Sequence, residues 1–209
     1  VRDGIDVEKY RPYMQKITDA LIFLGYPPCE GNIMVSNPAW CKSYLNFKDD
    51  ISRWVGTQDM KNFLDLAIFA DSFAVAGDKQ MLIDLKEFLY SKVQNDIFMA
   101  YFAKSTTAFE TPTTISTFMG KENFINIKKA AIFPIVHGIR SLALKEKIKE
   151  TTTIKRIQIL EQRKILEKDR AAELLEALEI VNTLRLRHQI DLLQQNKPLS
   201  NEIDTNILG

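Results

Sequence analysis

The sequence is poor in residues that could form cross-links or hold a metal. Cys29 and Cys41 are its only cysteines, too few for a disulfide framework and without the four-ligand spacing of a structural zinc site. His137 and His188 are its only histidines. They fall in different predicted helices, which disfavours a histidine-based metal centre. This cysteine usage is typical of reduced thiols in a cytoplasm.

Long apolar runs and an excess of one charge are also missing. No stretch approaches the roughly 20 apolar residues that span a bilayer, and no secretion signal opens the sequence. Lys and Arg number 28 against 27 Asp and Glu, a formal net charge of +1, so no global field favours nucleic acid or an anionic membrane. We therefore expect a cytoplasmic protein that contacts neither.

The short motifs of common enzyme sites are absent too. The sequence contains no GxGxxG, Walker loop, HExxH or GxSxG. Its 209 residues, 45% of them hydrophobic and 26% charged, suit a globular protein with a buried core. Composition and these motifs leave the function open.

Apolar residues recur at helical spacing through most of the chain. The exception is the aromatic run FLDLAIFADSFAV at 63–75, which favours a buried strand. The pattern predicts a mostly α fold with a small α+β part, followed by a C-terminal helical bundle. The predicted helices cover residues 7–24, 44–55, 78–101, 132–147, a segment starting near 151, and 169–195.

A threonine-rich segment, STTAFETPTTISTFMG at 105–120, contains a proline and shows no clear period. Such composition is typical of an exposed connection. We interpret it as the boundary between residues 1–104 and residues 121–209.

Three polar residues fall on apolar helix faces. Arg140 lies among the apolar positions of 132–147, and Arg185 and His188 share a face with the leucines of 169–195. A buried unpaired guanidinium is costly. Each arginine therefore forms an internal ion pair or binds phosphate, and both interpretations stay open. His188 is read as a structural histidine, and the basic cluster Lys145, Lys147, Lys149, Lys155 and Arg156 as solvated surface.

Six strings together resemble a known family in the same order: LGYPPCEGNIMVSNPAW, IFADSFAVAGD, INIKKAAIFPIVHGIRSLAL, TTTIKRI, LRLRHQ and NEIDTNIL. The family comprises bacterial nucleotidyltransferases related to the uridylyltransferase that modifies the PII nitrogen-signalling protein. Its members typically carry cyclic-nucleotide-binding and CBS domains upstream. The resemblance implies that residues 1–104 are the back half of a nucleotidyltransferase-like domain and residues 121–209 a helical C-terminal domain.

The family's chemistry is Mg²⁺-dependent nucleotidyl transfer, in which metals neutralise the transferring phosphate. A Gly-Ser turn holds the phosphates, and an Asp-x-Asp strand and a later carboxylate bind Mg²⁺. The resemblance makes Asp71 that later carboxylate. Arg140 and Arg185 are candidate nucleotide contacts because each could bind phosphate from its apolar helix face. From the residues alone, Asp71 could merely end a strand. The family tends to show an Asp-x-Arg motif at Asp71, but here Ser72 and Phe73 follow the aspartate, so the arginine is missing. The family also shows an Asp-x-Lys motif, and here Asn126 replaces its aspartate.

Gly-Ser and Asp-x-Asp occur nowhere in the 209 residues. One carboxylate holds Mg²⁺ poorly. We therefore expect the C-terminal portion of a signalling nucleotidyltransferase whose intact parent uses a nucleoside triphosphate and an unidentified acceptor, while this chain alone is inactive. The alternative is a non-catalytic regulatory module that binds a protein partner or forms a homodimer.

The loop at 25–40, GYPPCEGNIMVSNPAW, is unusually long for a compact domain. The resemblance implies that it lies on the active-site side. In one interpretation, Asn37 and Trp40 contact a nucleotide base. In the other, Trp40 holds together a self-packed Ω-type loop that binds no ligand. Both interpretations stay open.

Overall fold

The computed structural model describes residues 1–93, 95–108 and 124–204. Helices dominate these ranges, and none of the described helices is long and apolar enough to cross a membrane. The elements in chain order are η1 (Val7–Tyr10), α1 (Arg11–Phe23), α2 (Tyr44–Gly56), α3 (Met60–Asp71), α4 (Lys79–Lys92), α5 (Asp96–Lys104), η2 (Ser105–Ala108), β1 (Phe124–Asn126), η3 (Lys128–Ile132), α7 (Phe133–Lys145), α8 (Thr153–Gln162), α9 (Lys168–Gln194) and β2 (Glu202–Asp204).

The strand predicted at 63–75 is wrong, because residues 60–71 form helix α3. Its buried residues Phe63, Leu66, Ala67 and Ala70 repeat at i, i+3, i+4 and i+7, a helical period that a short aromatic run conceals. The side chain of Asp59 also accepts an N–H bond at the start of the helix, which favours this conformation.

The single long helix predicted over 78–101 is divided into α4 and α5. The side chain of Asn95 accepts hydrogen bonds from the backbone N–H groups of Ile97 and Phe98. This local bond competes with the helical ladder and begins a new helix. The apolar residues keep a helical spacing across this break, so the sequence pattern did not reveal that there are two helices.

The mostly α fold with a small β part is confirmed. In the described ranges, strand pairing joins β1 to β2 in antiparallel fashion, with Ile125 opposite Ile203. The sheet therefore lies in the second half of the chain, away from the position predicted for the strand. The connection predicted at 105–120 falls mostly outside the described residues, and the division of the chain there stays a prediction.

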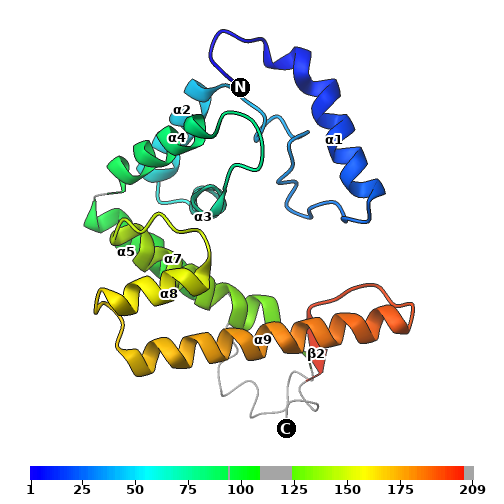
Figure 1. Cartoon of the computed structure of the whole chain (residues 1–209), viewed down its shortest axis with the longest axis vertical. Helices are drawn as coiled ribbons and strands as arrows, with labels where there is room; N and C mark the ends of the chain where they lie inside the picture. Colours follow the sequence, from blue (N-terminus) through cyan, green and yellow to red (C-terminus); the bar gives the residue numbers. More distant parts are fainter. Residues whose placement is uncertain (94, 109–123, 205–209) are drawn as a thin grey trace.

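Two apolar clusters build the core, and α7 contributes to both. The first unites α2, α3, α4 and α5 around Ile51, Leu66, Leu89 and Phe102, and it includes Leu144 of α7. The second joins Ile139 and Ala143 of α7 to α8 and α9. Figure 1 shows α9 lying along α8, and α7 contacts both α8 and α5. Helix α7 thus connects the two clusters.

Helix α1 stands apart from both clusters (Figure 1). It ends at Phe23, and Gly25 shortly after it has a φ of 94°, a left-handed conformation that glycine adopts readily. The apolar face that the sequence predicts is largely in solvent, with Tyr10, Ile17, Leu21 and Leu24 exposed. The buried residue of α1 is Thr18.

Candidate functional site

Asp71, the last residue of α3, is bound by two arginines from distant parts of the chain. Arg140 of α7 donates from Nε to Asp71 Oδ2 at 2.9 Å, and its Nη2 donates to the same oxygen. Arg156 of α8 donates from Nη1 to Asp71 Oδ1 at 2.6 Å. The side chain of Arg156 is 1% exposed and that of Asp71 is 27% exposed. Guanidinium groups therefore engage both carboxylate oxygens.

Lys86 of α4 adds a third cation beside Asp71. Its Nζ donates to the carbonyl of Ala70 at 3.2 Å and to the carbonyl of Ser72. These carbonyls lie at the C-terminus of α3, where the helix dipole is negative and attracts a cation. Burial lowers the pKa of Lys86, and nearby Arg156 lowers it further. Positive side chains thus outnumber the single carboxylate of Asp71.

His137 holds Arg140 from the other side. Its Nδ1 lies 3.1 Å from Arg140 Nη1, and its Nε2 lies 2.9 Å from the carbonyl of Phe102 and 2.8 Å from Ser105 Oγ. Because a guanidinium only donates, Nδ1 accepts and Nε2 carries the proton. The imidazole is therefore neutral. Burial is the main cause that lowers the pKa of His137, and the charge of Arg140 acts in the same direction. We call Asp71, Lys86, His137, Arg140 and Arg156 the Asp71 cluster.

The lowered pKa of His137 predicts a loss of stability in acid. Below the usual pKa of His137 the unfolded chain binds a proton on this side chain, whereas the folded chain does not. The free energy of unfolding therefore falls as the pH drops from about 6.5 towards the lower pKa that His137 has in the folded chain. The slope of this contribution is at most about 1.4 kcal/mol per pH unit. Urea unfolding at about pH 7.5 and about pH 5.5 measures it.

The variant His137→Gln should show a smaller loss between those two conditions than the unchanged chain. His188→Gln on α9 is the matched control for removal of an imidazole. An equal loss in His137→Gln and in the unchanged chain would show that acid acts through other groups. Arg140 and Asp71 are the charged groups nearest to His137.

The structure brings together two of the predicted site residues, Asp71 and Arg140, and pairs them as ions. Sequence reasoning missed Arg156, which it assigned to a solvated surface. The same wheel argument that singles out Arg140 applies to Arg156, because Arg156 lies four residues before the fully buried Leu160.

The other predicted nucleotide contacts lie elsewhere. Arg185 donates from Nε to Asn201 Oδ1 at 2.8 Å, which links α9 to the segment before β2. Asn37 uses its amide within the loop at 25–40: Nδ2 donates to the carbonyl of Asn32 at 2.7 Å, and Oδ1 accepts from Ala39 N at 2.9 Å. Trp40 packs on Trp54, with ring centroids 6.0 Å apart. These contacts favour the self-packed form of the loop.

A pocket of about 600 Å³ opens between α3 and α7, next to the Asp71 cluster. Apolar side chains form most of its lining, and His137, Arg140, Ser105 and Lys61 supply its polar groups. Its volume falls within the roughly 300–1,000 Å³ typical of small-molecule sites. The apolar lining residues are Met60, Phe63, Leu64, Ala67, Ile68, Ile132, Phe133 and Val136.

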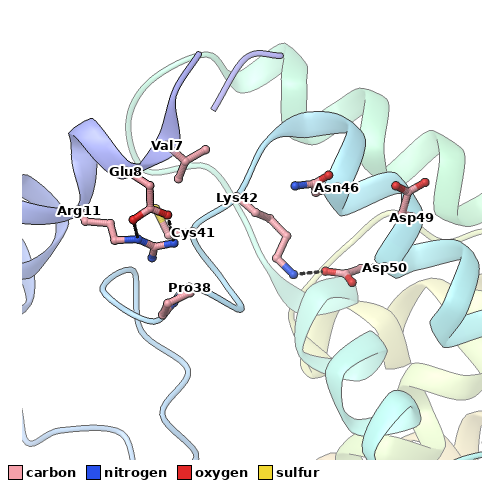
Figure 2. Close-up of a pocket in the computed structure, with 9 residues that line it drawn as sticks. All are labelled: Val7, Glu8, Arg11, Pro38, Cys41, Lys42, Asn46, Asp49 and Asp50. Atoms are coloured by element: carbon pink, nitrogen blue, oxygen red, sulfur yellow. Dashed lines mark hydrogen bonds and ion pairs between the residues drawn. The ribbon is translucent and has the colours of Figure 1, made fainter. Parts of the chain in front are cut away.

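A second, more polar hollow of about 410 Å³ lies between η1, the loop before α2, and α2 itself (Figure 2). Its charged side chains largely pair with one another: Arg11 binds Glu8, and Lys42 binds Asp50. These pairs neutralise much of the charge in the lining, and Nη1 of Arg11 is buried there without a hydrogen-bond partner among the described residues. This hollow is a weaker candidate than the pocket between α3 and α7.

The Asp71 cluster as it stands does not fit Mg²⁺. A Mg²⁺ ion needs several oxygen ligands, whereas Asp71 offers one carboxylate whose two oxygens already accept bonds from Arg140 and Arg156. Across the described ranges, no group of three His, Cys, Asp or Glu side chains could hold a metal ion. A metal role for Asp71 stays a prediction, and it requires both arginines to release the carboxylate.

Two protein-family models match segments of the chain. The model described as "Putative nucleotidyltransferase substrate binding domain" matches residues 96–209, and the model described as "Putative nucleotidyltransferase DUF294" matches residues 2–61. The chain belongs to this nucleotidyltransferase family. No curated protein and no solved structure matches it.

The residues of the Asp71 cluster fall partly inside and partly outside the segments that the two family models match. Arg140, Arg156 and His137 lie inside the match to the nucleotidyltransferase substrate binding domain. Asp71 and Lys86 lie between the two matched segments. The ion pairs of Asp71 therefore connect the substrate binding domain of this nucleotidyltransferase-like chain to the helices that precede it.

Proposed function

We propose that this chain is the substrate-binding portion of a nucleotidyltransferase and that it does not transfer nucleotides by itself. The observation that carries the proposal is the double engagement of Asp71 by Arg140 and Arg156. The carboxylate that the family resemblance assigns to the metal is thereby neutralised within the protein. The lack of Gly-Ser and Asp-x-Asp in the sequence supports the same view.

In the intact parent implied by the resemblance, Mg²⁺ neutralises charge on the transferring phosphate, and a nucleoside triphosphate and an acceptor hydroxyl are the partners. The role of the residues of this chain is to bind and orient the substrate. Arg140 is suited to phosphate because its guanidinium is planar, always charged and already fixed in place by Asp71 and His137. A role in signalling rests on the resemblance alone.

Pyrophosphate release tests the proposal. The purified chain, incubated with Mg²⁺ and each of the four nucleoside triphosphates, should release no pyrophosphate above a protein-free blank. The variant Asp71→Asn should give the same result, because Asp71 holds arginines rather than metal. Release that depends on the chain and disappears in Asp71→Asn would contradict the proposal and restore Asp71 as a metal ligand.

A second candidate function is a protein-interaction module. The exposed apolar face of α1 favours it, with Tyr13 61% exposed and Leu24 69% exposed, since exposed apolar patches of this kind mark interaction sites. Light scattering on the sample used for the pyrophosphate assay distinguishes the candidates. A self-associated chain that binds no nucleotide favours the module.

A further inference from the structure

The pocket between α3 and α7 is lined by two chemically different sets of side chains. Its walls are apolar: Leu64 and Ala67 come from α3, and Phe133 and Val136 come from α7. His137 and Arg140 of α7 add polar groups to the same lining. A ligand that fills such a space needs a flat or apolar body and an anionic group beside Arg140.

Arg140 is prepared to bind that anionic group. A guanidinium carries five N–H groups. The recorded bonds of Arg140 use one on Nε, one on Nη2 and one on Nη1, to Asp71 and His137. Two N–H groups remain for a ligand. Because Asp71 and His137 already hold the side chain, binding costs little further ordering.

The net charge around Arg140 supports an anion rather than a neutral ligand. Asp71 and Glu150 supply two negative charges, whereas Arg140, Arg156 and Lys86 supply three positive charges. Lys61 also lines the pocket, but it lies at the start of α3, ten residues from Asp71, and does not add to the charge beside Arg140. The neutral His137 contributes no charge, because its Nδ1 accepts a hydrogen bond from Arg140. A single phosphate would reduce this excess.

We propose that this pocket binds a nucleoside monophosphate, with the base between the apolar walls of α3 and α7 and the phosphate on Arg140. The aromatic ring of Phe133 and the branched side chains of Leu64 and Val136 suit a planar base. The choice of a nucleotide rests on the proposed function, whereas the pocket and its cation do not. The binding needs no metal, since the guanidinium of Arg140 supplies the positive charge beside the phosphate.

Calorimetric titration of the full chain in EDTA tests the site. AMP or UMP should bind, and adenosine and inorganic phosphate, each carrying half of the recognised chemistry, should bind at least about tenfold more weakly. Leu64→Glu places a negative charge in the pocket, and binding should fall by about tenfold or more. The matched control is Leu45→Glu on α2, because Leu45 is similarly exposed, 56% against 53% for Leu64, and does not line the pocket.

Three results would overturn the inference. The first is that neither AMP nor UMP binds below about 10 mM. The second is that Leu64→Glu and Leu45→Glu bind as the unchanged chain does. Equal binding of inorganic phosphate and AMP would show an anion site without base recognition and would also contradict it. Each result can occur whether or not pyrophosphate is released, so failure here is distinguishable from failure of the proposed function.

Discussion

Replacement of Asp71 by asparagine should lower the free energy of unfolding by about 3 kcal/mol. Asparagine keeps the shape of the side chain but removes the charge that compensates Arg156, whose side chain is 1% exposed. A guanidinium left buried without its partner loses the attraction that offset its removal from water. For a chain of this length the melting temperature should fall by roughly 6–12 °C.

Chemical denaturation of Asp71→Asn measures this loss, and Glu87→Gln is its matched control. Glu87 also forms a long-range ion pair, with Lys149, but those side chains are 51% and 66% exposed. Exposed pairs contribute little, so the control should lose about 0.5 kcal/mol or less. Equal small losses in both variants would show that Asp71 is not a structural counter-ion.

The same experiment extends to a double-mutant cycle. Arg156→Met removes the buried cation, so Asp71→Asn in that background should cost less than it does alone. The coupling energy should be about 1–3 kcal/mol. Additive losses would indicate that Asp71 and Arg156 do not interact in solution.

Replacement of Phe102 by alanine should cost about 3–5 kcal/mol. Phe102 is 0% exposed, and its ring lies 5.8 Å from those of Phe63 and Phe98 and 4.6 Å from the imidazole of His137. Its removal leaves a cavity where α3, α5 and α7 meet. The loss of stability therefore reports on the packing of α5 against α7, in addition to packing within the first cluster.

Urea unfolding of Phe102→Ala should show a lower midpoint with an unchanged slope. Phe23→Ala is the control, because Phe23 is 90% exposed on α1 and should change stability by no more than about 0.5 kcal/mol. A loss below about 1 kcal/mol for Phe102→Ala would contradict the arrangement of α5 against α7.

Features that depend on neighbouring residues were predictable. The helices at 44–56 and 168–194, the end of the first helix near Gly25, and the mostly α fold follow from apolar spacing and terminating residues, which act within a few positions. The family also follows from strings that can be read in order along the chain. Arg140 could be singled out because a charge stood where its helix should be apolar.

The candidate site depended on the tertiary structure. Asp71 meets Arg140 and Arg156 across 69 and 85 residues, and no local pattern reports which distant side chains will pair. Helix α3 was mistaken for a strand because a short apolar run satisfies both periods, and packing against α2 and α5 decides between them. The sequence by itself determined most of the helices and the family, because these arise from local spacing and ordered motifs. Only the tertiary structure decided that Asp71 is a counter-ion beside a pocket, because burial and charge pairing arise when distant segments meet.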